Sequence, residues 1–365
     1  MAGIPATADM RAPVSQIKIL DWVRANLFSS WANTALTLLV GYILLRTLMG
    51  FVPWGIFNAV WVGSADECKA AKGTGACWAF FPANWRFILF ATFPYEEHWR
   101  PALATIAFIF LYVFSSMRAN WNSRLVYVWV GGLAFIGLMM FGGILGLSFV
   151  PTERWGGLVL TLILATFGIA FAFPLAVLLA LGRRSDMPAV KTICIAFIEL
   201  IRGVPLISVL FMASVMFPLF LPEGVTFDKL LRAQVGIILF AAAYLAEVVR
   251  GGLQALPKGQ YEAADSLGLS YWQAMRMIVL PQALRMVIPP MVNTFIGLFK
   301  DTSLVLIIGL LDVLNAAKTA AAQPEWRGYG PEVYFGISLM YFVFCFAMSK
   351  YSQQVEVDLN RHKHR

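Results

Sequence analysis

Two short groups of polar residues interrupt strongly apolar parts of this 365-residue chain. The first group is Glu199 with Arg202, and the second is the run Lys300, Asp301, Thr302 and Ser303. A charged side chain at the centre of a bilayer costs at least about 2.5–3.5 kcal/mol, so such residues pair with one another or lie along the path of a polar solute. Both groups are candidates for lining a translocation path for a zwitterion, with cations facing its carboxylate and Glu199 or Asp301 facing its ammonium group.

Glu199 and Arg202 are three residues apart, which places them on one face of a helix. At 1.5 Å per residue they lie about 12–17 Å from the expected cytoplasmic start of that helix, near the middle of the membrane. Gly203 and Pro205 follow and loosen the helix. We expect the two charges to pair. Direct contact with a substrate and a structural polar network between helices and subunits both remain open as their role.

The run from Lys300 to Ser303 interrupts a later apolar segment that already contains Pro289 and Pro290. Many transporters present the ends of such broken helices to a substrate at the membrane midplane. The same two interpretations apply to this run: a lining for the path, or a polar network that holds helices together.

The composition indicates which elements position these groups. The chain is 59% hydrophobic and 13% charged, with a mean hydropathy of +0.72, whereas about a quarter of the residues in a soluble domain are charged. Residues 157–181 contain no charge, and about 20 apolar residues suffice to cross a bilayer. Backbone polar groups in lipid must be satisfied within the segment, so the spans must be helical. We therefore predict an all-α, polytopic protein in the lipid bilayer.

About eight segments are expected to be transmembrane helices. They are residues 32–52, 101–117, 125–149, 156–182, 191–217, 233–256, 285–313 and 332–350. With the N-terminus placed in the cytoplasm, sixteen of the 28 Lys and Arg residues fall in cytoplasmic segments and nine in outer ones. This bias follows the positive-inside rule and predicts that both termini are cytoplasmic. It also accounts for the net charge of +8 without nucleic acid as a partner.

A polar insert, residues 257–281, separates two of the apolar segments and falls on the cytoplasmic side. Residues 260–267 are mostly acceptable helix formers, and Glu262 lies in the first turn, where the helix dipole favours a negative charge. Ala263 and Ala264 leave a low face that the backbone of a partner could approach. The insert is thus a candidate docking element for a soluble protein.

The second half of the insert carries signals for a bend. Gly268 suits the left-handed residue that closes a helix, and Ser270 with Gln273 forms an S-x-x-Q capping box that opens the next helix. The sequence predicts a short helix, a sharp bend and a second helix that ends at Pro281. On this pattern alone, both helices could instead lie on the lipid headgroups as an ordinary amphipathic loop.

Cysteine and histidine residues give little sign of a cofactor. Cys68 and Cys77 share the long outer loop, residues 53–100, in the oxidising compartment, where either a disulfide or two free thiols are possible. Cys194 and Cys345 lie in apolar segments and are expected to be packing residues. No set of Cys and His residues has the spacing of a metal site, and we expect no metal or other cofactor.

Several segments resemble the polar-amino-acid permeases of bacterial ABC importers. Residues 197–206 read FIELIRGVPL, 243–252 read AYLAEVVRGG, 257–260 read PKGQ, 280–285 read LPQALR and 298–304 read LFKDTSL. These matches occur in order and cover roughly residues 155–350. The three spans before them, with the Trp-rich outer loop, are similar to the membrane subunits of general L-amino-acid importers. Val204 departs from the family, in which Thr is common at this place, without changing the class.

The resemblance implies a type I ABC importer permease core and a coupling loop, residues 257–281, that receives force from an ATPase. The coupling residues that it implies are Gly259, Glu262, Ala263, Ala264, Gly268, Ile278, Leu280 and Pro281. It also implies a second permease subunit in a heterodimer, two cytoplasmic ATP-binding subunits and a periplasmic amino-acid-binding protein. The chain itself is not expected to be an enzyme, because it contains no Gly-Lys dipeptide and hence no P-loop.

The expected organisation is that of a multi-pass protein of the bacterial inner membrane. It has a cytoplasmic N-terminal segment (1–31), three extra spans with a large periplasmic loop (32–154), the permease domain (155–350) and a basic cytoplasmic tail (351–365). The alternative from another class is a stand-alone, ion-coupled secondary transporter of small polar solutes, which would need no docking loop. A membrane enzyme is a third alternative, but no nucleophile–base set supports it.

Overall fold

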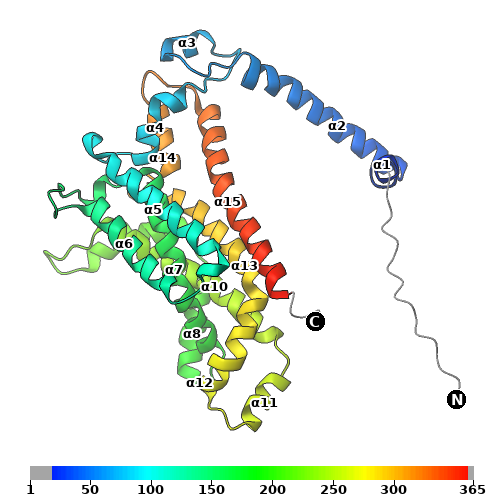
Figure 1. Ribbon diagram of the computed structural model, residues 1–365, viewed down its shortest axis with the longest axis vertical. Helices are drawn as coiled ribbons and strands as arrows, with labels where there is room; N and C mark the ends of the chain where they lie inside the picture. The colour runs from blue at the N-terminus through cyan, green and yellow to red at the C-terminus, as the bar shows by residue number, and fades with distance from the viewer. Residues whose placement is uncertain (1–18, 361–365) are drawn as a thin grey trace. The chain divides into compact units, whose positions relative to one another are not determined.

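The structure is a computed structural model that describes residues 19–360, and within them the regular structure is helical apart from two isolated β-bridges (Figure 1). In that range seven helices are long and apolar enough to cross a membrane, or eight if the bent pair Pro188–Arg202 and Leu206–Phe220 forms one span. This confirms the predicted all-α, polytopic fold with about eight spans.

The first 18 residues of the predicted segment 1–31 and the last five of the predicted tail lie outside the described residues.

By its internal contacts the chain divides after Ala79 into two compact units. The described part of the first unit contains α1 (Ile19–Leu27), α2 (Trp31–Val52) and α3 (Ala65–Ala70), with a π-helical turn (Pro53–Phe57) that continues α2. The Ser30 hydroxyl begins α2 by accepting a hydrogen bond of 3.2 Å from the Asn33 N–H. This is the usual way of satisfying a free donor at the start of a helix.

Cys68 and Cys77 form a disulfide in the first unit, with their Cα atoms 5.5 Å apart. Beside it, the Trp78 ring lies edge-on to the Trp54 ring with 6.1 Å between centroids. The Trp78 indole donates a hydrogen bond of 2.7 Å to the Gly55 carbonyl. The segment after α3 is therefore connected to the end of α2. Of the two alternatives that the sequence left open, a disulfide or two free thiols, the structure has the disulfide.

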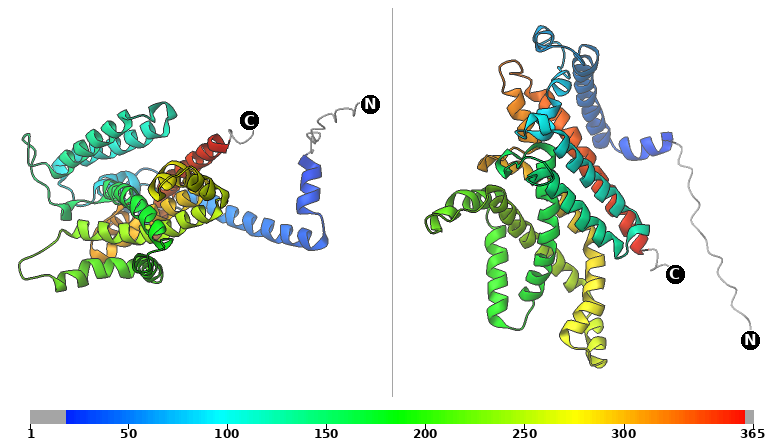
Figure 2. Two further views of the ribbon diagram at one scale, coloured as in Figure 1. Left: turned by 90° about the horizontal axis from the view of Figure 1, so that it is seen from below. Right: turned by 60° about the vertical axis from the view of Figure 1, so that its left-hand side comes forward.

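The second unit carries the remaining helices. Its α-helices are α4 (Phe80–Phe90), α5 (Trp99–Ser116), α6 (Arg124–Phe141), α7 (Gly157–Arg183), α8 (Pro188–Arg202), α9 (Leu206–Phe211), α10 (Lys229–Ala255), α11 (Gly259–Ser266), α12 (Tyr271–Ala274), α13 (Leu280–Asp301), α14 (Val313–Ala321) and α15 (Gly330–Asn360). Figure 1 and the right-hand view of Figure 2 show α11 and α12 together at one end of this unit and α4 and α14 at the opposite end.

The centre of the second unit is the pair α7 and α10, which pack along most of their length and contact α13. Both helices carry small residues that are fully buried or nearly so: Ala172, Ala176 and Ala180 on α7, and Ala241, Ala242, Ala243 and Ala246 on α10. Small side chains let helices in a membrane approach closely, and van der Waals contact replaces the hydrophobic effect there. These two helices form the frame that positions the candidate site.

Two predicted span boundaries were wrong, whereas the interruption expected at Gly203 and Pro205 is present. Span 125–149 ends at Phe141, because Gly142 has a φ of +66° and the chain leaves the helix there. The last helix does not stop at 350 but continues to Asn360, so most of the predicted tail is helical. Span 191–217 bends by 105° between α8 and α9, where Pro205 cannot continue the helix.

Candidate functional site

The polar insert forms the predicted short helix, α11, and Gly268 closes it. Gly268 has a φ of +70°. The Gly268 N–H donates to the Asp265 carbonyl at 2.9 Å, and the Leu269 N–H donates to the Ala264 carbonyl at 3.2 Å. These two bonds define a Schellman motif, in which glycine is favoured because it adopts the left-handed conformation without strain. No atom lies within 4 Å of where a Cβ on Gly268 would stand, so only the backbone conformation limits this position.

After the bend, the Ser270 N–H donates to the Gln273 Oε1 at 2.9 Å and opens α12 as the capping box predicts. The predicted end of this helix at Pro281 was wrong, because α12 continues through a π-helical turn (Met275–Val279) directly into α13. Pro281 lies in the first turn of α13, where its missing N–H is tolerated after the wider π turn. The second half of the insert thus begins a helical run that extends to Ile308.

Hydrogen bonds join α11 to three long helices. The Tyr261 hydroxyl donates to the Leu253 carbonyl of α10 at 3.1 Å, and Arg184, just after α7, donates to the same hydroxyl at 3.1 Å. On the other side, the Gln282 amide of α13 donates to the Gln260 Oε1 at 2.9 Å. α11 is therefore hydrogen-bonded to α10, to α13 and to the residue that directly follows α7.

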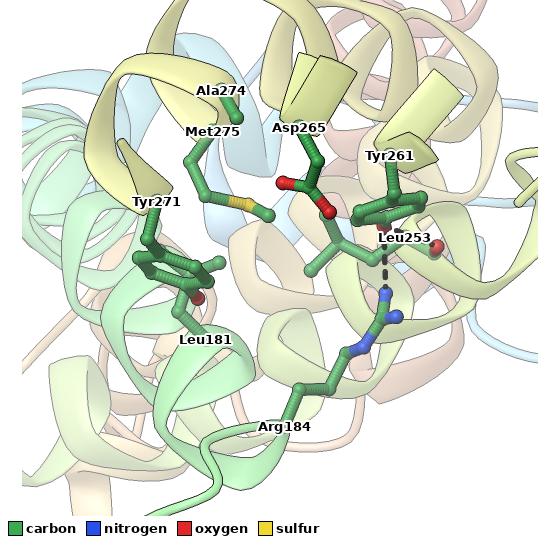
Figure 3. Close-up of a pocket in the computed structure, with 8 residues that line it drawn as sticks. All are labelled: Leu181, Arg184, Leu253, Tyr261, Asp265, Tyr271, Ala274 and Met275. Carbon is green, nitrogen blue, oxygen red and sulfur yellow. Dashed lines mark hydrogen bonds between the residues drawn. The ribbon is translucent and has the colours of Figure 1, made fainter. Parts of the chain in front are cut away.

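A hollow of about 240 Å³ lies between α11 and the ends of α7 and α10 (Figure 3). It is lined by Leu181, Arg184, Leu253, Tyr261, Asp265, Tyr271, Ala274 and Met275. Figure 3 shows the Asp265 carboxylate and the Met275 thioether pointing into this space while Arg184 reaches Tyr261. Because the hollow leaves part of the inner face of α11 unpacked, the hydrogen bonds of Tyr261 carry much of its attachment.

The insert exposes three large apolar side chains among its polar ones. Leu267, Trp272 and Met277 are 75%, 65% and 67% exposed, and Glu262 and Ala263 are exposed beside them. Ala264 is fully buried, so of the predicted alanine face only Ala263 is open to a partner. Of the other predicted coupling residues, Gly259 and Pro281 are exposed, and Ile278 and Leu280 are partly buried in the helical run.

The predicted pair of Glu199 with Arg202 does not form. Glu199 bonds to Arg183 at 2.8 Å, and Arg202 lies 3.7 Å from Glu247. Glu247 is the centre of the arrangement, because Arg183 reaches it at 3.0 Å and Arg250 at 2.8 Å. We call these five residues from α7, α8 and α10 the arginine–glutamate cluster. Its three cations and two anions leave one positive charge in excess.

Glu199 and Arg202 lie closer to the end of α7 than their distance from the start of α8 suggests. Gly182 lies so close to Cys194 that an added Cβ would stand 2.4 Å from the Cys194 Sγ, so the first turns of α8 extend beyond the end of α7. From Cys194, Glu199 and Arg202 are about 7.5 and 12 Å further along the helix. Counting from the start of α8 thus overestimated their separation from the end of α7, where Arg183 meets Glu199.

The second polar group lies where α13 ends. The Thr302 side chain is buried and its hydroxyl donates to the Phe299 carbonyl at 2.8 Å, while the Ser303 hydroxyl donates to the Lys300 carbonyl at 2.9 Å. Lys300 is exposed and Asp301 is partly buried. From Thr302 the chain continues as a 3-10 helix, η8 (Thr302–Ile308). η8 packs against α9, so the segments that follow the two interruptions lie together.

Sequence reasoning missed a buried acidic residue, Asp312, which is fully buried at the start of α14. Asp312 accepts hydrogen bonds from the backbone N–H groups of Leu314 and Asn315, from the Asn315 amide and from the Tyr341 hydroxyl. Burial raises the pKa of the Asp312 carboxyl, and these hydrogen bonds oppose that shift. The sequence signal was an Asp directly before an Ala-rich stretch, which is typical of a helix N-cap.

No group of three His, Cys, Asp or Glu residues among the described part of the chain could hold a metal ion.

Comparison with known proteins agrees with this geometry. Residues 172–353 match the family described as binding-protein-dependent transport system inner membrane component. The chain is 48% identical over 351 residues to the inner membrane amino-acid ABC transporter permease protein YhdY of Escherichia coli (strain K12), with 94% of each protein covered. It is 38% identical over 417 residues to the glutamate/glutamine/aspartate/asparagine transport system permease protein BztC of Rhodobacter capsulatus, with 96% of each covered.

A solved structure is also similar. A chain from the crystal structure of an amino acid ABC transporter with histidines matches with a TM-score of 0.50 and 31% identity, over 55% of this chain and 92% of that chain.

The fold and these matches define a non-catalytic membrane permease subunit of an ABC importer. The chain belongs to the family of binding-protein-dependent transport system inner membrane components. It is therefore an inner-membrane component that operates with an ATPase and a binding protein. The resemblance seen in the sequence is confirmed, and the alternative of a stand-alone secondary transporter is not supported.

Proposed function

We propose that this permease translocates L-amino acids delivered by a periplasmic binding protein. Two relatives that align over nearly their whole length are named as an amino-acid permease and as a permease for glutamate, glutamine, aspartate and asparagine. A zwitterionic cargo also suits the chemistry of the two interruptions, where charged groups of both signs lie near broken helices.

The transporter would contain this chain paired with a second, different permease subunit and with two cytoplasmic ATP-binding subunits. We place both termini, α11 and α12 in the cytoplasm, and α4 and α14 on the periplasmic side. The distribution of Lys and Arg supports this orientation. The absence of a P-loop from the sequence supports assigning ATP hydrolysis to a partner.

The chain would consist of a translocating domain and an N-terminal addition, with a cytoplasmic segment at each end. Residues 155–350 form the translocating domain, for which the family match over residues 172–353 is the support. Residues 32–154 add three spans and the disulfide-bonded outer segment, with residues 1–31 and 351–365 as cytoplasmic ends.

Force from the ATPase would enter through α11. The observation that carries this proposal is the attachment of α11 to α7, α10 and α13 through Tyr261, Arg184 and the Gln260–Gln282 pair. An exposed apolar surface formed by Leu267, Trp272 and Met277 lies beside it. A helix that docks a partner on one side and is held by three transmembrane helices on the other can move all three together.

The path for the cargo would pass the two interruptions. Glu199 and Arg202 lie in the last turn of α8, just before the first interruption. The run Lys300 to Ser303 lies at the second interruption, where α13 ends. Their proximity is supported by the packing of α9 against η8. Thr302 is the weakest of these candidates, because its side chain is buried and its hydroxyl is bonded to the backbone.

Site-specific cross-linking tests where the ATPase docks. In a chain that lacks Cys194 and Cys345, Ala263→Cys carries a photoactivatable maleimide, and the matched control Thr319→Cys carries the same group on the exposed face of α14. We expect an adduct with the ATP-binding subunit from position 263 and none from position 319. An adduct only from position 319, or from neither position in a complex that transports, would contradict both the docking site and the orientation.

A further inference from the structure

Side chains from α14 and α15 form a buried hydrogen-bond network that contacts the first residues of the 3-10 helix η8. The centre of this network is Asp312, whose carboxylate accepts from the Tyr341 hydroxyl of α15 at 3.0 Å and from the Asn315 N–H at 3.1 Å. Asp312 and Asn315 are 0% and 3% exposed. Every neighbour of the carboxylate named here is a donor, so it acts purely as an acceptor that orients the side chains around it.

Asn315 connects this centre to the polar interruption. Its amide nitrogen donates both to the Asp312 carboxylate and to the Ser303 carbonyl, the latter at 2.7 Å. Ser303 is the second residue of η8, and its carbonyl lies at the junction of two kinds of helix. Ser303 is partly buried, and the donor matters to the extent that its carbonyl is withdrawn from water, because a buried unsatisfied carbonyl costs about 1–3 kcal/mol.

Tyr341 forms the second connection. Its hydroxyl donates to Asp312 and lies near the Thr302 hydroxyl, which itself donates to the Phe299 carbonyl. Its ring packs edge-on against Phe299, with 5.4 Å between centroids. The first residues of η8 are thus contacted from α14 through Asn315 and from α15 through Tyr341.

The network is anchored to the start of α7. The Gly157 N–H donates to the Leu311 carbonyl at 2.8 Å, and the Val313 N–H donates to the Thr161 hydroxyl at 3.2 Å. The residues on either side of Asp312 are therefore fixed to the helix that pairs with α10. Figure 1 shows α14 beside the upper part of α15, where this anchor lies.

We propose that Asp312, Asn315 and Tyr341 are positioning residues that set the place of Ser303 and of the 3-10 helix Thr302–Ile308 along the translocation path. This inference rests on the proposed function, because it takes the second interruption as part of the path. A 3-10 helix has weaker internal hydrogen bonds than an α-helix, so its position depends more on side chains that contact its backbone. Removing these contacts shifts the segment without removing any group that meets the cargo.

The experiment uses the assembled transporter with its ATPase and binding protein, with L-glutamine and L-glutamate as probes. Asn315→Ala removes the donor to the Ser303 carbonyl, and Tyr341→Phe removes one hydroxyl while keeping the ring. We expect normal assembly, a half-saturating probe concentration changed by roughly threefold to tenfold, and a changed glutamine-to-glutamate uptake ratio. Faster amide exchange is expected in peptides covering residues 302–308.

Thr319→Ala and Tyr334→Phe are the matched controls, because both residues are exposed on the same two helices, α14 and α15. We expect wild-type values for both. A merely structural role for the network would lower the amount of complex without changing the half-saturating concentration or the uptake ratio, and that result would overturn the proposal.

If Asn315→Ala does not assemble, Tyr341→Phe decides alone. Unchanged exchange, affinity and uptake ratio in Tyr341→Phe also overturn the proposal. Uptake that no longer requires the ATPase would instead mark failure of the proposed function, so the two failures are distinguishable.

Discussion

The Tyr261 hydroxyl donates a hydrogen bond of 3.1 Å to the Leu253 carbonyl, which joins the short helix α11 to the last turns of α10. Arg184 donates to the same hydroxyl and lies over the Tyr261 ring, with 5.6 Å from its guanidinium carbon to the ring centroid. One side chain thus links the proposed docking helix to the two helices at the centre of the fold.

Tyr261→Phe should weaken that link and leave the packing intact. The change removes two hydrogen bonds, each of which contributes about 0.5–1.5 kcal/mol. We expect ATP-driven uptake to fall severalfold while the amount of assembled transporter stays normal, as measured in proteoliposomes. Tyr127→Phe, at a residue 76% exposed on α6, is the control. Equal uptake by both variants would show that the hydroxyl does not transmit force.

Within the arginine–glutamate cluster, Glu247 should matter more than Glu199. Glu247 contacts Arg183, Arg202 and Arg250, whereas Glu199 contacts only Arg183 and its side chain is 56% exposed. Removing an ion-pair partner is costly when it leaves buried charges unpaired. We expect Glu247→Gln to reduce assembled complex roughly threefold to tenfold and Glu199→Gln to have little effect, measured by detergent extraction and size-exclusion chromatography. The reverse order would contradict the arrangement.

Double substitutions should distinguish the actual ion pairs from the expected one. Glu199→Ala with Arg183→Ala should recover part of the loss caused by Arg183→Ala alone, because the two side chains bond directly. Glu199→Ala with Arg202→Ala should recover less, because these two side chains do not bond directly and are coupled only through Arg183 and Glu247. Thermal unfolding of the three single and two double variants measures both cycles, and recovery only in the second cycle would argue against the observed pairing.

The disulfide predicts a particular labelling pattern. In a chain without Cys194 and Cys345, a membrane-impermeant maleimide added to intact spheroplasts should label nothing until an external reductant opens the Cys68–Cys77 bond. Labelling should then reach both cysteines, because the outer segment is placed on the periplasmic side. Labelling only after permeabilisation would place this segment, and hence the whole topology, on the wrong side.

The short helix and its bend could be predicted because their signals are local. Gly268 needs a positive φ and Gln273 needs only to reach a backbone N–H three residues away, so neither depends on the rest of the fold. The apolar segments were predictable for a similar reason, since the bilayer fixes their length and polarity.

Contacts between residues that are far apart in the sequence could not be predicted from local signals. Glu199 has Arg202 three residues away, but Arg183, sixteen residues earlier, is the partner that the packing of α7 on α8 brings within 2.8 Å. Likewise, Asp312 gives a helix-start signal in the sequence, but only the fold shows that Tyr341 donates to it. Pro281 was predicted to end a helix because proline lacks the backbone N–H. The π-helical turn before it, which lets the helix accept this proline, was not visible in the sequence.

The most direct test of the central claim is the number of probe molecules transported per ATP hydrolysed by Gly268→Val. Gly268 has a φ of +70° with no neighbour near its missing Cβ, so valine distorts the end of α11 through the backbone alone. Gly251→Val is the control, since Gly251 lies within α10 with equal space around it and no positive φ. The account predicts that Gly268→Val assembles but transports far fewer probe molecules per ATP hydrolysed, while Gly251→Val transports the wild-type number. A wild-type ratio for Gly268→Val at normal assembly would contradict the claim that α11 couples the ATPase to transport.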